Sequence, residues 1–251
     1  MNSIGKTLRT SAIFRDDGRT LIFAMDHGGY YGPLPGIEKP RETLVKVIGG
    51  GADAVMINYG MVKQCLEVIS GKIACILSIP PDVKYVKKAV KIGAHAIKCG
   101  YFGPLENCEK YFFLGSIALE CERWEMPFLC EIVPMNSKNK VLHTKEAVEK
   151  AARIGAEFGA DFMKIPYTGS PVSFKEVVES ATIPSVIMGG EKMDTDKDVL
   201  ETVNGSVEGG GCGVAFGRNI FQHRDPAAIT RAIAKIIHED STVEEALKEV
   251  K

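Results

Sequence analysis

Apolar residues along this chain gather in short continuous runs, and longer segments with a helical spacing of apolar positions separate one run from the next. The runs lie at 21–25, 54–58, 74–79, 96–100 and 128–133, within 159–169 around Lys164, and at 185–190 and 213–218. Continuous runs of this length are typical of strands that are buried on both faces of a parallel sheet. The pattern therefore predicts eight parallel strands.

The segments between these strands carry the periodicity of amphipathic helices. We expect helices after Pro40 up to 49–51, at about 82–92, at about 105–124, after Thr144, from Ser173, from about Asp196, and in the last part of the chain. Strands that alternate with helices, with no linker between separate domains, favour a single (β/α)8 barrel over residues 1–251. A doubly wound sheet is the alternative. The mixed, polar residues 1–20 are expected to cover one end of the body.

Composition narrows the range of partners. The 251 residues carry 31 basic and 32 acidic side chains, a formal net charge of -1. This balance gives no electrostatic surface that would attract nucleic acid or an anionic membrane. We therefore expect small-molecule partners, together with self-association into a homo-oligomer.

The cysteines point to a reducing compartment. Seven cysteines are scattered singly, with no Cys-x-x-Cys pair and no spacing typical of a metal site. Most lie in apolar runs, where cysteine acts as a buried hydrophobic residue. No apolar segment approaches the length of about 18 residues that a membrane-spanning helix needs, and no signal sequence is evident. The protein is expected to be cytoplasmic.

Lys164 lies inside one of the apolar runs, between Gly159 and Pro166. An ammonium buried without a partner costs several kcal/mol, so Lys164 is either paired or used at an open end of the sheet. Desolvation or a neighbouring cation lowers a lysine pKa toward ~7 to 8, which leaves a free amine able to attack a carbonyl. The alternative is a structural ion pair, or a side chain that extends from the strand end to solvent.

In a barrel, the carboxyl ends of all strands meet at one rim, so polar residues at those ends converge. These residues are Asp26, His27, Lys98, Glu131, Lys164, Gly189, Gly190, Gly217 and Arg218. The glycines after the seventh and eighth strands occupy the positions where barrels most often bind phosphate, because their N–H groups can approach an oxyanion closely. Arg218 would add charge-assisted hydrogen bonds. The rim is thus predicted to bind a phosphorylated ligand.

Several motifs at this rim carry a family resemblance: Met25-Asp26-His27-Gly28, Met163-Lys164-Ile165, Gly189-Gly190 and Gly217-Arg218-Asn219. Over nearly its whole length the chain resembles the archaeal-type class I fructose-bisphosphate aldolase family, which shares a superfamily with deoxyribose-phosphate aldolase. Relatives include aminodideoxyheptulosonate synthases and a thiolase that acts on a phosphorylated pentanedione. The resemblance implies that Lys164 forms a Schiff base with a ketone and that Asp26 assists proton transfer. It also implies that the glycine loops and Arg218 bind phosphate, with no cofactor and no metal.

The chain departs from that family on the fifth strand. The aldolases and heptulosonate synthases carry an acid/base tyrosine there, whereas this chain has Val133. Glu131 lies two residues earlier on the same strand face, and it could replace the tyrosine if the barrel interior raises its pKa. Alternatively, Glu131 pairs with Lys98 on the adjacent strand. For His27 two roles also stand open, a substrate contact or an inward structural hydrogen bond.

Three functions are compatible with these residues. The leading hypothesis is a Schiff-base aldolase that acts on a phosphorylated ketone or sugar through Lys164. The second is acyl transfer of the thiolase kind on a phosphorylated diketone. The third is a phosphosugar-binding protein that has lost catalysis along with the tyrosine.

Overall fold

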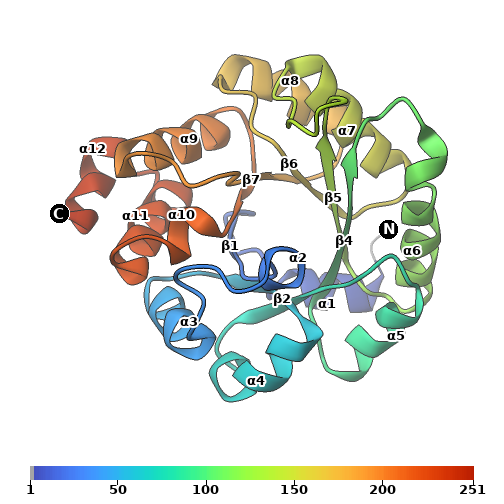
Figure 1. Cartoon of the computed structure of the whole chain (residues 1–251), viewed down its shortest axis with the longest axis horizontal. Coiled ribbons are helices and arrows are strands. Elements are labelled where there is room, and N and C mark those ends of the chain that lie inside the picture. Colours follow the sequence, from blue (N-terminus) through green and yellow to red (C-terminus); the bar gives the residue numbers. More distant parts are fainter. Residues whose placement is uncertain (1–2) are drawn as a thin grey trace.

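Eight parallel strands close into a barrel with helices around the outside (Figure 1). The computed structural model describes residues 3–251. The strands are β1 (Thr20–Ala24), β2 (Ala54–Asn58), β3 (Ala74–Ser78), β4 (Ala96–Gly103), β5 (Phe128–Pro134), β6 (Phe162–Ile165), β7 (Ser185–Met188) and β8 (Gly213–Phe216). Each strand pairs in parallel with the next, and β8 pairs with β1. The predicted (β/α)8 barrel is confirmed, and the alternative of a doubly wound sheet is wrong.

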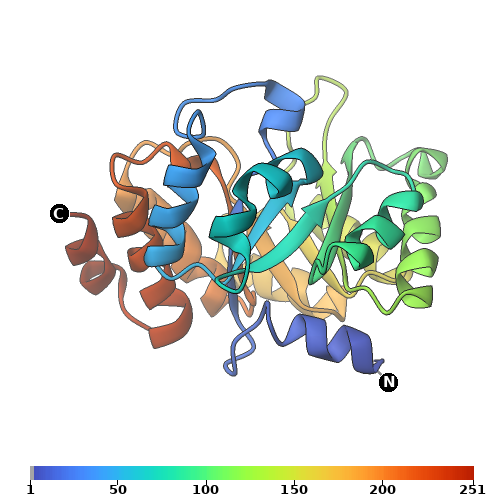
Figure 2. The same ribbon diagram turned by 90° about the horizontal axis from the view of Figure 1, so that it is seen from below.

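Most of the helices lie on the outer face of the barrel, while the N-terminal helix lies below the strands and the short helix that follows β1 lies above them (Figure 2). They are α1 (Ile4–Thr10), α2 (Gly28–Tyr31), α3 (Pro40–Gly49), α4 (Tyr59–Ile69), α5 (Lys84–Lys91), α6 (Phe113–Arg123), α7 (Lys145–Glu157), α8 (Pro171–Ala181), α9 (Asp196–Glu208), α10 (Arg218–Phe221), α11 (Pro226–Glu239) and α12 (Val243–Ala246). Two short 3-10 helices, η1 (Cys108–Tyr111) and η2 (Leu247–Val250), complete the set within residues 3–251.

Two connections differ from the prediction. Helix α4 fills a segment for which the pattern predicts no helix, and it buries Val62, Cys65 and Ile69 at helical spacing. The helix expected at 105–124 begins only at Phe113. The Asn107 side chain accepts a hydrogen bond from the Glu109 backbone, so the segment before Phe113 forms the separate η1 turn.

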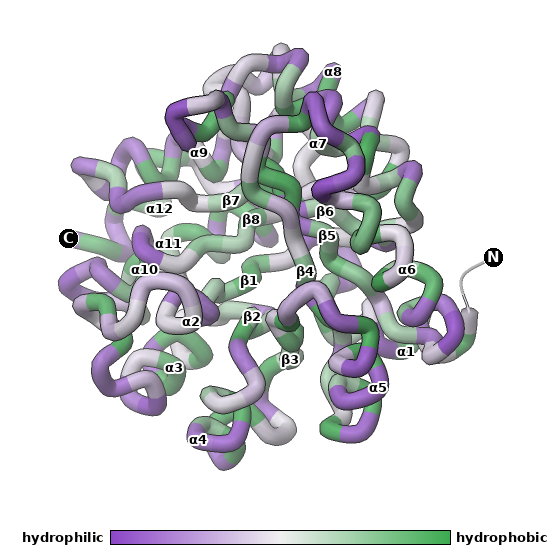
Figure 3. Tube along the Cα trace, turned by 45° about the vertical axis from the view of Figure 1, so that its right-hand side comes forward, coloured by the Kyte–Doolittle hydropathy of each residue, from purple (hydrophilic) through white to green (hydrophobic). Residues whose placement is uncertain are grey.

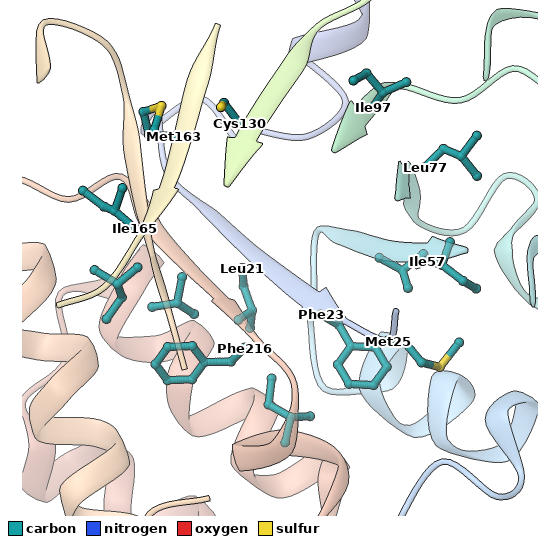
Figure 4. Packing of buried hydrophobic residues seen from close by; sticks show 14 of the residues in the cluster. Leu21, Phe23, Met25, Ile57, Leu77, Ile97, Cys130, Met163, Ile165 and Phe216 are labelled. Carbon is teal, nitrogen blue, oxygen red and sulfur yellow. The ribbon is translucent and has the colours of Figure 1, made fainter. Parts of the chain in front are cut away.

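Apolar side chains form two layers because successive strand residues point to opposite faces. The outer layer lies between the strands and the helices, and Figure 4 shows part of it, including Phe23, Ile57, Ile97 and Phe216. The inner layer fills the barrel itself with Ile22, Ala24, Ala54, Met56, Ala74, Ile76, Ala96, Leu129, Phe162, Val186 and Ala215. In Figure 3 the hydrophobic colour accordingly lies mostly along the strands and the hydrophilic colour on the outer helices and loops. The barrel is therefore a packed core, without an open channel through its apolar layer.

The segment before β1 closes one end of the barrel, as predicted. Ile13 is fully buried and joins the inner layer. The Phe14 ring packs edge-on against Phe162, with 5.3 Å between ring centres. Figure 2 shows the N-terminal helix below the strands and the segment that follows β1 above them. The N-terminal segment thus covers the lower end, and the strands reach their carboxyl ends at the opposite, upper rim.

Most of the cysteines are buried, as expected from the apolar runs in which they lie. All seven are free thiols, and five of them are buried. Over residues 3–251, the structure contains no helix long and apolar enough to cross a membrane.

Candidate active site

The inward-facing positions of the strands change from apolar to polar at the rim. Asp26 follows the inner residue Ala24 by two positions, and Lys164 follows Phe162 in the same way. Because side chains two residues apart point to the same face, these polar groups lie directly above the apolar layer. The polar layer consists of Asp26, Asn58, Ser78, Lys98, Glu131 and Lys164. Strand alternation thus brings together, around one axis, residues that are far apart in the sequence.

Four charged side chains of this layer form a continuous chain of ion pairs. Lys164 Nζ lies 2.7 Å from Glu131 Oε1, and the other oxygen of Glu131 lies 2.5 Å from Lys98 Nζ. Lys98 Nζ in turn lies 3.2 Å from Asp26 Oδ2. All four residues are buried, with exposed fractions between 2% and 6%. Two cations that alternate with two carboxylates balance one another, which is the condition under which charges can be buried.

The mutual pairing shifts the pKa values of Glu131, Asp26 and Lys98. Burial by itself raises the pKa of the Glu131 carboxyl, but the Lys164 and Lys98 ammonium groups outweigh it and hold that pKa below its usual value. Burial opposes ionisation of Asp26 as well, and Lys98 and Lys164 again hold its pKa well below the ordinary range. The pKa of Lys98 is raised, because Glu131 and Asp26 outweigh the effect of its burial.

The two interpretations of Glu131 can now be separated. The pairing of Glu131 with Lys98 is confirmed. The raised pKa suggested for Glu131 is wrong, because two lysines face this carboxylate and stabilise its charge. Glu131 is therefore an ionised carboxylate paired with two lysines, while Val133, where the family tyrosine would stand, is a buried apolar residue.

Two polar residues that the sequence analysis did not single out hold Asp26 in place. The Ser78 hydroxyl donates a hydrogen bond of 2.8 Å to Asp26 Oδ2. The Asn58 amide donates one of 2.8 Å to the Asp26 backbone carbonyl. Both residues end their strands on the inward face, so a polar residue two positions beyond a predicted inner residue is the signal that would have found them.

His27 lies beside the cluster without a structural hydrogen bond at Nδ1. This nitrogen is 3.9 Å from Asp26 Oδ1, and among residues 3–251 it is a buried polar atom without a hydrogen-bond partner. Burial lowers the pKa of the ring, and the Lys164 and Arg218 cations lower it further despite the opposing effect of Asp26. A neutral imidazole with a free ring nitrogen is suited to a substrate contact, which is one of the two roles left open for His27.

The loops after β7 and β8 are joined by side-chain hydrogen bonds. Arg218 Nε donates to the Gly190 carbonyl at 3.0 Å. The buried Asn219 amide donates to the Gly189 carbonyl at 2.9 Å, and its oxygen accepts from the Met193 backbone at 2.8 Å. Gly190 adopts a φ of +63°, which glycine tolerates at little cost. The structure thus brings the predicted phosphate residues together, and it adds Asn219 as the residue that holds the two loops in register.

Gly217 serves a packing role at this junction. A Cβ atom at this position would lie 2.2 Å from Cε1 of His27 and 2.7 Å from the Ala24 carbonyl oxygen. The His27 ring also packs edge-on against Phe221, with 5.3 Å between ring centres. The glycine therefore leaves the space in which the imidazole packs against Phe221, the last residue of α10.

The opposite end of the barrel also contains a cavity, of about 730 Å³, whose lining includes Arg15, Asp53 and Lys72. Arg15 and Asp53 are paired with each other there at 2.6 Å. Within the described part of the chain, no group of three or more His, Cys, Asp or Glu side chains is arranged to hold a metal ion. We place the candidate site at the rim, because the linked charges lie there.

Comparison with protein families and curated proteins agrees with this geometry. The family model described as DeoC/LacD family aldolase matches residues 20–223. The chain is 32% identical over 272 residues to an uncharacterised aldolase of Saccharolobus solfataricus, covering 99% of this chain and 100% of that protein. It is 34% identical over 258 residues to 2-amino-3,7-dideoxy-D-threo-hept-6-ulosonate synthase 1 of Archaeoglobus fulgidus, covering 98% of this chain and 95% of the synthase.

Solved structures give the same result in three dimensions. A Schiff-base-forming fructose-1,6-bisphosphate aldolase superposes with a TM-score of 0.82 at 29% identity, covering 93% of this chain and 100% of that one. An archaeal fructose-1,6-bisphosphate aldolase, with its catalytic lysine bound to the carbinolamine intermediate, superposes with a TM-score of 0.81 at 28% identity. It covers 92% of this chain and 99% of the aldolase.

Proposed function

The chain belongs to the DeoC/LacD aldolase family, and we propose that it acts as a class I aldolase whose Schiff-base residue is Lys164. The observation that carries this assignment is the contact of 2.7 Å between Lys164 Nζ and Glu131 Oε1 inside the barrel. A buried amine beside an ionised carboxylate has a base within hydrogen-bond reach, which is the arrangement that imine formation needs.

Imine formation uses this pair directly. Glu131 removes a proton from the Lys164 ammonium, and the free amine attacks the ketone carbon. A proton then passes from the nitrogen to the new alkoxide oxygen, which gives a neutral carbinolamine. The protonated Glu131 then donates its proton to the carbinolamine hydroxyl, which leaves as water while the nitrogen lone pair forms the iminium. Lys98 stays on the other oxygen of Glu131. It stabilises the carboxylate that is regenerated at the end of the step.

Carbon–carbon cleavage is the next step, and it uses Asp26, the second carboxylate that pairs with Lys98. Asp26, ionised and fixed by Ser78 and Lys98, takes the proton from the hydroxyl on the carbon that will leave. The electron pair of the breaking bond moves into the iminium and forms an enamine, while the leaving carbon becomes a carbonyl. Asp26 returns its proton to the enamine carbon, and hydrolysis of the iminium releases the ketone. Condensation is the reverse of this sequence.

The proposed substrate is a phosphorylated ketone or sugar. Gly189, Gly190 and Gly217 would offer backbone N–H groups to the phosphate, and Arg218 would offer its guanidinium from the same junction. The free Nδ1 of His27 points to a further substrate contact there. The similar proteins act, by name, on fructose 1,6-bisphosphate or form an amino-dideoxy-heptulosonate. No metal or cofactor enters the proposed chemistry.

The linked charges favour an enzyme over a binding protein without catalysis. Burying two lysines and two carboxylates is costly, and a phosphosugar could be held by the glycine loops alone. We also propose a cytoplasmic homo-oligomer. Free, mostly buried cysteines are typical of reducing compartments, and exposed apolar side chains such as Val45 and Leu66 offer surface for self-association.

Borohydride trapping tests the assignment. The protein is incubated with phosphorylated ketoses and diketones, reduced, and mapped by mass spectrometry. We expect a stable adduct on Lys164, and none in Lys164→Met, which keeps the apolar stem and removes the amine. Lys150→Met, on the exposed surface of α7, is the matched control and should trap normally. Turnover in Lys164→Met near the unmutated rate would rule out the imine, and a requirement for coenzyme A would favour acyl transfer.

A further inference from the structure

An aromatic side chain that the mechanism above does not use lies over the charge cluster. Tyr30 belongs to α2, the short helix that follows Asp26 and His27, and α2 crosses the mouth of the barrel (Figure 1). The centre of the Tyr30 ring is 5.6 Å from Lys98 Nζ. Phe102, at the end of β4, is 5.5 Å from the same nitrogen and 6.4 Å from the Tyr30 ring. Two rings from different segments therefore cover Lys98 from above.

The rings face the space where a substrate must lie. Tyr30 is 62% exposed and Phe102 is 46% exposed, whereas Lys98 beneath them is 2% exposed. The neighbouring Tyr31 is 66% exposed, and its ring lies beside that of His27 instead, with 6.4 Å between centres. A bound substrate would thus meet Tyr30 on the side of Asp26, Ser78 and Lys98.

Partial burial keeps the phenol of Tyr30 protonated. Burial is the main reason that the pKa of Tyr30 is raised; Lys98 opposes it, while the Asp26 and Glu131 carboxylates add to it and Ser78 lowers the pKa slightly. Both carboxylates of the cluster are ionised acceptors, and Lys98 is already engaged with the two of them. The Tyr30 hydroxyl is accordingly a neutral donor beside the charged side chains of Asp26 and Lys98.

We propose that Tyr30 is a further catalytic residue, whose phenol donates a hydrogen bond to the substrate oxygen that becomes negatively charged when the carbon–carbon bond forms or breaks. This inference rests on the proposed aldolase function. In condensation, the enamine pair forms the new bond and the aldehyde π pair moves onto oxygen. Asp26, which took up the proton from the donor carbon, delivers it to that alkoxide, and the Tyr30 proton stays on the phenol. The role is that of an oxyanion donor.

The test uses dihydroxyacetone phosphate as the donor probe, with a series of aldehydes as acceptors. Tyr30→Phe keeps the ring, its contact with Phe102 and its cover over Lys98, and it removes only the hydroxyl. We expect kcat for condensation to fall about 10² to 10³-fold, because loss of one oxyanion donor has that effect. Borohydride trapping on Lys164 and exchange of the donor α-proton with deuterium should stay at the unmutated level, since neither step forms the alkoxide on the acceptor carbon. Tyr31→Phe is the matched control and should retain full activity.

Three results would overturn the proposal. Unmutated kcat in Tyr30→Phe would remove the hydroxyl from catalysis. A parallel fall of trapping, exchange and condensation would make Tyr30 a structural support of the rim rather than an oxyanion donor. Absence of trapping in the unmutated protein would sink the imine mechanism and this inference together, which distinguishes that failure from the first two.

Discussion

Lys164 and Glu131 occupy directly paired positions on adjacent strands, and their side chains meet at 2.7 Å inside the barrel. The register of β5 and β6 therefore sets the distance between the proposed nucleophile and its base. The same carboxylate also holds Lys98 at 2.5 Å. One side chain thus links the imine site to the side of the rim where carbon–carbon cleavage is proposed.

Replacing the Glu131 carboxylate with an amide of the same shape should lower both the activity and the stability of the protein. Glu131→Gln is nearly isosteric, but it removes the base and leaves Lys98 and Lys164 with less compensating charge. We expect kcat to fall ~10² to 10⁴-fold. We also expect the free energy of unfolding to fall by roughly 3 to 5 kcal/mol, since a buried ion pair loses one partner. Steady-state kinetics and urea denaturation measure the two effects. Glu106→Gln, at an exposed position, should change neither, and unimpaired turnover in Glu131→Gln would contradict the proposed role.

The lowered pKa values of Asp26 and Glu131 predict that the enzyme stays active at unusually low pH. Asp26 and Glu131 both have lowered pKa values, so they stay ionised as the pH falls through the ordinary carboxyl range of about 4. The acidic limb of kcat/KM should therefore lie below that range. Lys98→Met removes the cation that both carboxylates share, so their pKa values should rise and the limb should move to higher pH. A profile that is identical in the variant would show that Lys98 does not control their ionisation.

Arg218 should contribute to the binding of the substrate's phosphate group and to no other part of the substrate. In Arg218→Ala we expect KM for a phosphorylated substrate to rise ~10 to 100-fold, the effect of losing a charge-assisted pair of roughly 1.5 to 3 kcal/mol. KM for the dephosphorylated analogue should change little. Lys197→Ala removes a surface cation from α9 and is the control. Equal effects of Arg218→Ala on both substrates would take Arg218 out of the phosphate site.

The protonation of a second histidine, His238, should make the stability of the protein depend on pH. This residue lies far from the rim. His238 of α11 lies between two carboxylates, 2.7 Å from Asp17 and 2.9 Å from Asp53. Burial lowers the pKa of its ring, but the hydrogen bonds to Asp53 and Asp17 outweigh burial and raise that pKa above the usual value. A raised pKa means that the stabilising charge is fully present below the unfolded value of ~6.5 and is lost as the pH rises through the folded value.

His238→Gln should therefore destabilise the protein by ~1.5 to 3 kcal/mol at about pH 6, and by less at about pH 9. Chemical denaturation at the two pH values gives the difference. His143→Gln, at an exposed histidine whose Nδ1 lies 2.8 Å from the Tyr167 carbonyl, is the control variant. A loss from His238→Gln that is the same at both pH values would mean that the charge of the ring does not contribute.

The sequence by itself determined the barrel and most of the rim. Alternation of short apolar runs with helical segments is a local property, and it places Glu131 and Lys164 on strands and Asp26 just after one, whatever the details of packing. The sequence pattern did not predict where α6 begins, because the Asn107 side chain forms a local hydrogen bond that competes with helix formation.

Only the tertiary structure decided how the rim residues act on one another. Glu131 could have been a protonated acid or a paired base. The answer depends on Lys98 and Lys164, whose Nζ atoms lie 2.5 Å and 2.7 Å from its carboxylate oxygens. The hydrogen bond from Ser78 to Asp26 and the position of Tyr30 over Lys98 depend equally on how the strands and the loop after β1 come together. Electrostatic energies vary steeply with such distances and with burial, and neither quantity exists until the barrel has closed.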